Sequence, residues 1–540
     1  MERDQYNIKM CDLLSDRNTY RRVRTNPIST LQTKNNELVK WLNNNNFIDD
    51  REKNKMITYT AQLPSIYGLP KIHKPNLPLR PITSSMKVPC YELSKYVGRI
   101  LQCATTTSSY SVKNSFEFIE KAKLVKFQNN DVLVSYDVVS LFTNIPTQLA
   151  ITIVKKRWET IKENTKLSQN KFLEILDFCL KDNNYLQYKD DIYKQIFGMP
   201  MGNPLSPTIA DLVLDYLLDE CFEKMIEKPR FVAKYVDDIF AVINKDKIEE
   251  VLRSLNGFHP KIQFTIEMEK NFEIAFLDVK IRRQNDSLMF NWHQKDTASG
   301  RLINFRSNHP KHIILNTASN LISKIFTISD TCFHRTNEEK IIKMLRDNGF
   351  PSTLIRSLLF KHKNKIPQTK KDDRPTGYYN SVIFVPGLTE NFKKSIVNKT
   401  KNILMAYKPN MTLSHLFTKL KNKPEKDKAT DVIYKINCKG KPNEPCNLCY
   451  IGTTKQFLRQ RMSNHKSDIK SNNPGKTALA SHAIEYGHTP DFEDVKVLQT
   501  ERHTSKRYTL ETLHIINNKN NMNRKLDTQN ISSVYCSLVS

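Results

Sequence analysis

The sequence predicts an α+β protein of several domains, and three observations favour this fold class. The chain has 540 residues, enough for three or four domains and more than one hydrophobic core. Between residues 61 and 300, strand-like apolar runs alternate with segments of helical periodicity. After a basic, proline-containing segment at 361–377, strand-like runs return and end in the helical pattern TLETLHII, which indicates a small separate domain.

In chain order, five regions are expected. Residues 1–60 are polar and rich in Asn and Lys, which predicts a helical or partly loose extension. Residues from about 311 to 360 have helical periodicity. The expected regions are an N-terminal extension at 1–60, a main body at 61–300, a helical region at 301–360, a basic linker and connector at 361–430 and a small domain at 431–530.

The charge balance indicates a polyanionic partner. Lys and Arg total 84 and Asp and Glu total 56, a net charge of +28, so nucleic acid is the first candidate and a basic surface kept for solubility is the alternative. The hydrophobic fraction of 39%, with 26 Phe and 21 Tyr, argues for folded domains and against a disordered basic tail. With only 13 glycines and neither a GxGxxG nor a P-loop motif, a glycine-rich phosphate loop is not expected.

Compartment signals are sparse. No apolar run approaches the ~18 residues that a membrane span needs, so no membrane partner is expected. The start, MERDQYNIKMCDLLSDR, is too charged for a secretory signal. Most of the ten cysteines are scattered singly, which favours reduced intracellular thiols.

Two adjacent aspartates interrupt the most strand-like segment, RFVAKYVDDIFAVI. Asp237 and Asp238 would repel each other inside a sheet unless something neutralised them. A β-turn accommodates such residues, and so does a hairpin tip that holds a divalent metal.

A third aspartate follows a second strand, in DVLVSYDVVSLFTNIP. Asp137 lies where the short buried run Val132–Val134 ends. Nucleotidyl transfer with two metals needs carboxylates from separate strands around two Mg²⁺ ions ~3.5–4 Å apart. We therefore expect Asp137 and Asp237 to bind two Mg²⁺ ions, with Asp238 as an accessory ligand.

Two loops offer further contacts for a nucleotide. In GMPMGNPLSP, Gly198 and Gly202 flank a loop that is able to approach a base, and Ser206 is a predicted N-cap of the helix that follows. In YGLPKIHKPNLPLRPITSS, Lys71 and Arg80 lie in a proline-stiffened segment. These cations are suited to clamp a triphosphate, although a solvated loop is the alternative.

These pieces, in this order, resemble reverse transcriptases: LPKIHKP, LRPI, YDVVSLF, MGNPLSP and YVDD. The wider strings YGLPKIHKPNLPLRPI, SLFTNIP and FTIEMEKNFEIAFLDVKI, followed by FRSNHP, are similar to Penelope-like retroelements. The resemblance implies a right-hand fold, with fingers and palm at 61–300, a helical thumb at 301–360 and a primer-gripping hairpin around FLDVKIRRQNDSLMFNW. It also implies substrate contacts by Met201, Gly202 and Tyr235; Met201 stands where many reverse transcriptases carry Gln.

Phe142 bears on the choice of nucleotide. It follows Asp137 by five residues, and in the polymerase context an aromatic ring there would crowd a ribose 2′-hydroxyl and favour deoxynucleotides. RNA-dependent RNA polymerases usually place a polar acceptor near this position. Plain core packing of Phe142 is the alternative.

A second motif lies in VIYKINCKGKPNEPCNLCYIGTTKQFLRQRMSNH, which resembles the GIY-YIG nucleases. The resemblance implies a small α/β domain in which Glu511 binds one Mg²⁺, Arg461 stabilises developing charge and Tyr434 helps to deprotonate water. Val432 replaces the first glycine of the motif. The residues implied for the site are Tyr434, Tyr450, Arg461, His465 and Glu511, with Arg459 a rival of Arg461 and Glu501 a rival of Glu511.

Cysteines and histidines in this domain predict a structural Zn²⁺ site in an insertion between the two tyrosine motifs. Thiolate and imidazole ligands build tetrahedral zinc sites, and the Penelope-like endonuclease domains carry a similar set of two cysteines and two histidines. Either Cys438 or Cys449 completes the set, and lone buried cysteines are the alternative. The candidate ligands are Cys438, Cys446, Cys449, His482 and His488.

Together the two halves indicate target-primed reverse transcription, in which a DNA nick supplies the 3′-hydroxyl that the polymerase extends. The implied partners are an RNA template, target DNA, the RNA–DNA hybrid and dNTPs, and nuclear residence follows only from the need to reach chromosomal DNA. The alternatives are a domesticated binding protein with decayed catalytic sites and an RNA-dependent RNA polymerase.

Overall fold

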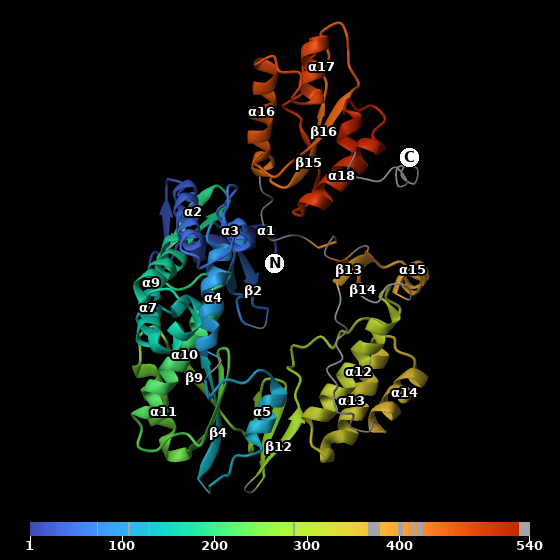
Figure 1. Cartoon of the computed structure of the whole chain (residues 1–540). Coiled ribbons are helices and arrows are strands. Elements are labelled where there is room, and N and C mark those ends of the chain that lie inside the picture. The colour runs from blue at the N-terminus through green and yellow to red at the C-terminus, as the bar shows by residue number, and fades with distance from the viewer. Residues whose placement is uncertain are drawn as a thin grey trace.

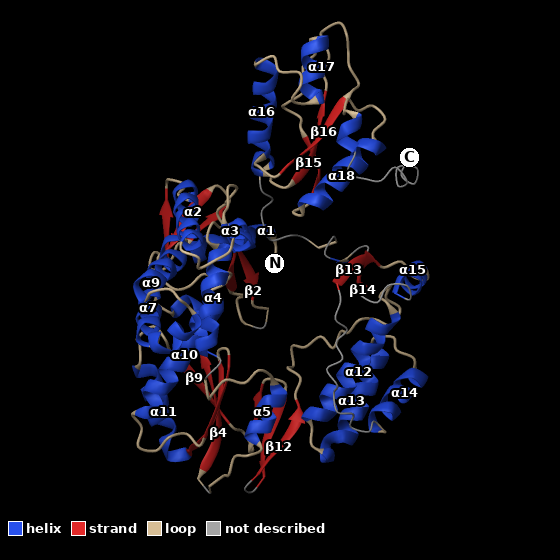
Figure 2. Cartoon of the chain, in the orientation of Figure 1, coloured by secondary structure: helices blue, strands red, loops and turns tan. Residues whose placement is uncertain are grey.

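The computed structural model arranges the chain as an N-terminal body, a helical region beside it, a small connector and a C-terminal domain (Figure 1). Figure 2 shows that helices and strands are mixed throughout the body and the C-terminal domain. The described residues are 1–72, 74–105, 108–128, 130–284, 287–364, 378–397, 403–409, 412–413, 416–417 and 425–528.

A five-stranded sheet of order β1-β6-β5-β2-β3 forms one end of the body. Its first strand comes from the segment expected to be a separate extension. Because β1 pairs antiparallel with β6, and because Leu38 and Leu42 of α2 lie in the main core, residues 1–60 are an integral part of the body. The strands are β1 (Tyr20–Val23), β2 (Ser65–Pro70), β3 (Leu79–Ser84), β5 (Tyr185–Tyr188) and β6 (Asp191–Gln195).

A four-stranded sheet of order β7-β8-β4-β9 lies at the centre of the body, and every neighbouring pair in it is antiparallel. Both faces of this sheet are covered, since successive residues of β4 enter different cores: Val134 and Tyr136 lie in the main core, and Leu133 lies in a second one. The strands are β4 (Asp131–Val138), β7 (Phe231–Tyr235), β8 (Asp238–Asn244) and β9 (Phe264–Met268).

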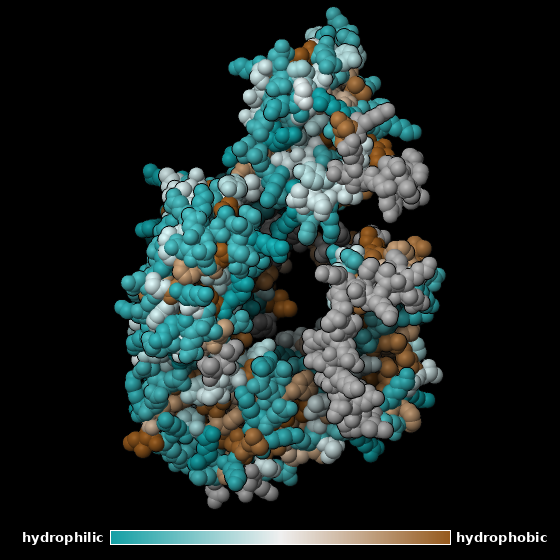
Figure 3. Space-filling model, viewed as in Figure 1, coloured by the Kyte–Doolittle hydropathy of each residue, from teal (hydrophilic) through white to brown (hydrophobic). Residues whose placement is uncertain are grey.

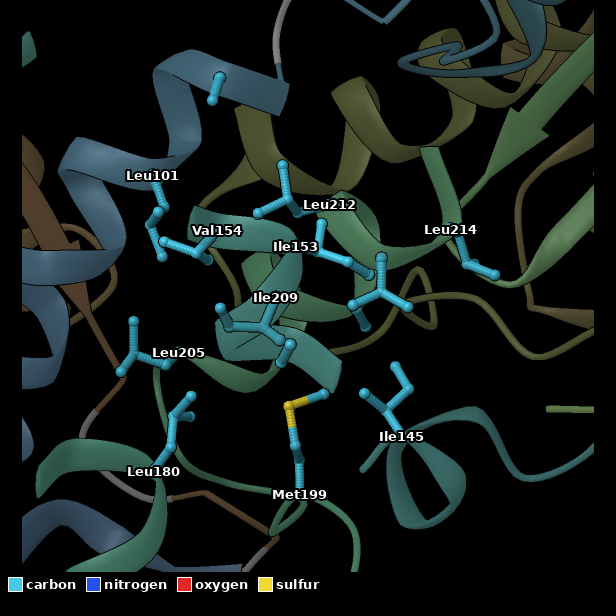
Figure 4. Close-up of a cluster of buried hydrophobic side chains, with 14 of the residues drawn as sticks. Leu101, Ile145, Ile153, Val154, Leu180, Met199, Leu205, Ile209, Leu212 and Leu214 are labelled. Atoms are coloured by element: carbon cyan, nitrogen blue, oxygen red, sulfur yellow. The ribbon is translucent and has the colours of Figure 1, made fainter. Parts of the chain in front are cut away.

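Helices cover this sheet and build the main core around α10 (Ser206–Glu223). Figure 4 shows Ile209 and Leu212 of α10 among Leu101, Val154 and Ile145, all almost fully buried. Burial of each such side chain is worth about 1.5–3 kcal/mol. The other helices of the body are α1 (Arg3–Leu14), α2 (Ile28–Asn44), α3 (Asp50–Met56), α4 (Tyr91–Thr105), α5 (Ser115–Ala122), α6 (Leu141–Asn144), α7 (Thr147–Lys156), α8 (Trp158–Ile161), α9 (Gln169–Asp177) and α11 (Ile248–Gly257).

A three-stranded sheet follows, formed by β10 (Glu273–Phe276), β11 (Val279–Gln284) and β12 (Ser287–Trp292). Phe118 of α5 joins it to the central sheet, since its ring packs 5.2 Å from that of Phe240 and 4.8 Å from that of Phe276. The predicted hairpin around FLDVKIRRQNDSLMFNW is therefore β11–β12.

The helical region contains α12 (Lys311–Ile328), α13 (His334–Asp347) and α14 (Ser352–Lys363), which share one core. A connector pairs β13 (Tyr378–Ile383) in parallel with β14 (Ile403–Lys408) beside α15 (Leu388–Val397). Most of the predicted basic linker, residues 365–377, lies outside the described residues.

The C-terminal domain has an antiparallel sheet of order β16-β15-β17 flanked by helices. The predicted strands VIYKI and CYIG and the predicted helix TLETLHII are all present. The elements are β15 (Val432–Asn437), β16 (Cys449–Thr454), β17 (Lys496–Thr500), α16 (Leu458–Lys470), α17 (Ala478–Tyr486) and α18 (Thr504–Asn517). Among the described residues, no helix is both long and apolar enough to cross a bilayer.

Candidate functional sites

Three carboxylates meet at one end of the central sheet. In the register of β4 with β8, Asp137 lies directly opposite Asp238. Tyr235 pairs with Asp238 across the β7–β8 hairpin, so Val236 and Asp237 form its two-residue turn, with Val236 at φ 57°. The strand-like segment therefore is a hairpin whose tip carries two of the acids.

The electrostatics of these acids favour a bound cation. Desolvation and the Asp237 carboxylate raise the pKa of Asp137. Desolvation raises the pKa of Asp238 as well, and Asp237 and Asp137 raise it further. Among the described residues, no lysine or arginine lies within 4.0 Å of any of the three carboxylates. Clustered acids of this kind match the oxygen ligands that Mg²⁺ prefers.

A cleft of about 880 Å³ opens in front of the acids, and both Asp137 and Asp237 line it. Cations face them from the opposite side. Desolvation and the neighbouring charges of Lys74 and Arg80 lower the pKa of Lys71, which shows that these cations crowd together. The basic residues that line the cleft are Lys71, Lys74, Arg80 and Lys295.

The loop that carries Met201 and Gly202 also lines this cleft. Thr83 of β3 donates its backbone N–H to the Met201 carbonyl at 2.8 Å, which holds the loop against the five-stranded sheet. At Gly202, with φ 137°, an added Cβ would lie 1.9 Å from the Thr83 carbonyl oxygen, so only glycine fits. Ser206 is the first residue of α10 and not its N-cap; its hydroxyl donates to the Pro200 carbonyl at 2.8 Å and braces the loop.

Phe142 and Tyr235 differ in their placement. Phe142, in α6, lines the cleft and also packs against the main core. Its position is therefore compatible with both contact with a nucleotide and core packing. Tyr235 ends β7 with 39% exposure and is not among the described residues that line the cleft.

Sequence reasoning missed three lysines near this site. Lys74 lies in the same proline-stiffened loop as Lys71, so the motif KIHKP offered a signal for it. Lys295 follows β12 without any recognisable pattern. Lys234 lies in β7, and the strand-like pattern around it gave no sign that its ammonium group is fully buried.

Lys234 anchors the hairpin to α10. Its Nζ forms ion pairs with Asp211 and with Asp215, the latter at 2.9 Å. Ser108 donates a further hydrogen bond to Asp215 at 2.7 Å. The backbone N–H of Lys234 also donates a hydrogen bond to the Tyr110 carbonyl at 2.8 Å. Strand β7, which ends at the turn that carries Asp237, is thus fixed by both the side chain and the main chain of Lys234.

The second constellation assembles in the C-terminal domain. The Tyr434 hydroxyl lies 2.8 Å from Nε2 of His465, and Nε of Arg461 donates to the same hydroxyl at 3.1 Å. The ring of Tyr450 packs 5.4 Å from that of His465. Arg459, the rival of Arg461, is exposed and stacks over Phe457 instead.

Burial dominates the electrostatics of this cluster. It raises the pKa of Tyr434 well above its usual range, raises that of Tyr450 to about 12 and lowers that of His465 to about 3. The pKa of Glu511 rises to about 7, first through desolvation and then through Asp527, although Arg461 opposes the shift. Glu501 instead accepts a hydrogen bond from the His503 N–H at 2.8 Å, and its pKa is lowered.

A separate cluster gathers Cys438, Cys446, His482 and His488. Their ligand atoms all lie within 4.8 Å of one another, and among the described residues this is the one His, Cys, Asp and Glu cluster with that spacing. The Sγ of Cys446 lies 3.6 Å from Nε2 of His482, and Nδ1 of His488 lies 3.1 Å from the same atom. Cys449 is buried in β16, outside this cluster, so the geometry selects Cys438.

The buried lysine leads to a stability prediction. Replacing Lys234 with Met leaves two carboxylates without their counter-ion and should lower the free energy of unfolding by about 3–5 kcal/mol. Urea denaturation of the full chain measures this change. Lys224→Met is the matched control, since Lys224 forms an exposed ion pair with Glu220 of the same helix at 3.1 Å and should cost less than about 1 kcal/mol. Equal losses in the two variants would contradict the anchoring role of Lys234.

Comparisons with solved structures give distant similarities. A telomerase from Candida albicans, in complex with a fragment of telomeric RNA, is 11% identical with a TM-score of 0.44, and the match covers 66% of this chain and 61% of that one. The RNA-dependent RNA polymerase of a human picorbirnavirus is 12% identical with a TM-score of 0.39, covering 66% and 74%. No curated protein matches the sequence.

Family models match two adjoining segments. Residues 301–359, the helices expected to form a thumb, match the animal helix-turn-helix domain. Residues 72–276, which contain all three clustered aspartates and most of the cleft, match the reverse transcriptase (RNA-dependent DNA polymerase) family. The chain therefore contains a reverse transcriptase-like polymerase domain, followed by a helix-turn-helix region.

Proposed function

We propose that this chain is an RNA-directed DNA polymerase that extends a DNA 3′-hydroxyl on an RNA template. One observation carries the proposal: Asp137, Asp237 and Asp238 converge at the end of the central sheet and face a set of cations across one cleft. The match of residues 72–276 to the reverse transcriptase family supports the same reaction.

Asp137 and Asp237, assisted by Asp238, would hold two Mg²⁺ ions. The fit is favourable because desolvation, and then the charge of Asp237, raise the pKa of Asp137 and of Asp238, a cost that a cation offsets. Bound in this way, the ions supply activation of the 3′-hydroxyl and neutralisation of the triphosphate.

The remaining groups of the cleft bind and select the nucleotide. Lys71 and Arg80, together with Lys74, would neutralise the triphosphate opposite the acids. Phe142 lines the cleft close to Asp137, where its ring would exclude a ribose 2′-hydroxyl and so favour dNTPs. Met201 and Gly202 offer a loop that comes near the templating base without projecting a bulky polar group.

We also propose that the C-terminal domain is a GIY-YIG-type DNA endonuclease. Glu511 would hold one Mg²⁺, which when bound polarises the scissile phosphate, and Arg461 would stabilise the developing charge. Tyr434 has full burial and a raised pKa, and its hydroxyl already contacts His465 and Arg461. Its role is better described as positioning Arg461 than as the base expected from the resemblance.

The cluster of Cys438, Cys446, His482 and His488 is suited to a structural Zn²⁺ ion. Two thiols and two imidazoles within 4.8 Å of one another supply the ligand number and chemistry of a tetrahedral site. Such an ion would tie the loop between β15 and β16 to α17 and to the turn that follows it.

With both activities, the chain would carry out target-primed reverse transcription of a Penelope-like retroelement. The nuclease would nick target DNA, and the polymerase would extend the new 3′-hydroxyl on the RNA of the element. The net charge of +28 suits a hybrid held through its phosphates. Access to chromosomal DNA would require residence in the nucleus.

A primer-extension assay tests the polymerase. On an RNA template with a DNA primer, the chain should incorporate dNTPs, and Asp237→Ala should lose activity at least a hundred-fold because a metal ligand is gone, while the exposed control Asp347→Ala keeps it. Phe142→Ala should raise incorporation of NTPs relative to dNTPs. A wild-type preference for NTPs would favour an RNA-dependent RNA polymerase, and no extension at all would favour a decayed binding protein.

A plasmid-nicking assay tests the nuclease. Glu511→Gln should abolish nicking and leave primer extension intact, whereas Glu501→Gln should retain both. Because only the ionised carboxylate binds a cation and burial raises the pKa of Glu511 to about 7, nicking should increase with pH across this value. Loss of polymerisation in Glu511→Gln would contradict the division into two sites.

Elemental analysis tests the zinc site. The purified chain should contain one zinc ion, and Cys446→Ser or His482→Ala should lose it and destabilise the C-terminal domain. Cys449→Ala should retain the metal, since Cys449 lies outside the cluster. Loss of zinc in Cys449→Ala but not in Cys438→Ala would reverse the ligand assignment.

A further inference from the structure

A second large cleft, of about 780 Å³, separates the N-terminal body from the C-terminal domain. Direct contacts define this boundary. The side-chain amide of Gln62 donates to the Lys428 carbonyl at 2.7 Å, and Nζ of Lys87 donates to the Thr430 hydroxyl at 3.0 Å. In Figure 1 the C-terminal domain accordingly lies beyond the end of the body that carries α2.

The charges along this cleft are mainly positive. Its lining contains five cations and two acids, and Lys428 pairs with one of the acids, Glu425, at 3.0 Å. Across the described parts of the chain, Lys189, Arg459 and Arg502 have no carboxylate partner within 4.0 Å. Much of the visible surface of the body around it is hydrophilic (Figure 3). A polyanion is therefore the favoured occupant.

Aromatic side chains accompany these charges. Tyr59 is 75% exposed at the cleft, an unusual state for a large ring. Phe457 lies on the opposite wall, with the guanidinium of Arg459 over its ring at 5.5 Å. Tyr59 is thus exposed and Phe457 half-buried. Rings that lie at a cleft beside cations are the features on which unpaired bases stack while the backbone is neutralised.

Strand β3 borders both the interdomain cleft and the polymerase cleft. Arg80 and Ile82 of this strand line the polymerase cleft, and Ser84, two residues further on the same side of the strand, lines the interdomain cleft. At about 3.3 Å per residue, Arg80 and Ser84 lie only about 13 Å apart. One strand of nucleic acid is long enough to occupy both clefts.

We propose that the interdomain cleft binds single-stranded nucleic acid, an unpaired overhang continuous with the duplex in the polymerase cleft. Its volume is in the range of about 300–1,000 Å³ that is usual for small-ligand pockets, which suits a few nucleotides. Tyr59 would stack on a base, while Lys189, Arg459 and Arg502 would contact phosphates. The inference deepens the proposed polymerase function by assigning a site to the strand outside the duplex.

Binding measurements on the full chain test this proposal. Fluorescence anisotropy in EDTA, without nucleotides, would compare a blunt primer–template duplex with the same duplex carrying a twelve-nucleotide overhang. Tyr59→Ala should weaken binding of the overhang substrate at least about five-fold, the lower range for one stacked base. Arg459→Ala should weaken it as well and make its salt dependence shallower by about 0.7.

Neither Tyr59→Ala nor Arg459→Ala should change binding of the blunt duplex. The exposed control Lys40→Ala, on α2 outside the cleft, should leave binding of both substrates unchanged. Equal weakening for blunt and overhang substrates, or no effect of either variant on the overhang substrate, would overturn the proposal. Because binding is measured without catalysis, an inactive polymerase would leave this readout intact. Failure of the proposed function and failure of the overhang site are thus distinguishable.

Discussion

The antiparallel pairing of β4 with β8 is the constraint on which the polymerase site depends. Backbone hydrogen bonds and the apolar residues of both strands fix a register in which Asp137 faces Asp238. The two-residue turn after Tyr235 then adds Asp237. This arrangement is costly for the ionised acids, since desolvation and the charge of Asp237 raise the pKa of both Asp137 and Asp238. A divalent cation bound between the carboxylates would offset that cost.

A second group of acids, next to the neighbouring strand β7, is compensated in a different way. Asp211 and Asp215 of α10 are neutralised directly by the buried ammonium of Lys234. Desolvation still raises the pKa of Asp215, but its lysine and Ser108 oppose that shift. The acids at the hairpin tip have no such close partner among the described residues, and their opposing lysines act across the open cleft. The two acid clusters thus differ in local compensation: a buried lysine neutralises one, and the other is left open to a cation from solution.

Much of the candidate site was predictable, because motifs with fixed local geometry identify their own residues. Asp137, Asp237 and Gly202 were predicted from strand ends and turns, whereas the C-terminal tyrosines were predicted from the resemblance to GIY-YIG nucleases. Long-range pairing was not predictable. Nothing in residues 1–60 indicates that β1 pairs with β6, and nothing in the segment around Lys234 indicates that its side chain reaches α10. Likewise, the motifs favoured Arg461 over Arg459 and Cys438 over Cys449 but left both rivals open, and the folded positions separate them.

The two domains are joined by more than the chain between them. Lys87 of the body donates a hydrogen bond to Thr430. The residue after Thr430, Asp431, forms an ion pair with Arg507 at 3.2 Å. Arg507 lies one turn from Glu511 on α18. Such contiguity is not itself energetic coupling. It does have a direct electrostatic consequence, because the charge of Arg507 opposes the upward shift of the Glu511 pKa. Arg507 therefore takes part both in the ion pair beside the domain boundary and in the electrostatic field that sets the pKa of Glu511.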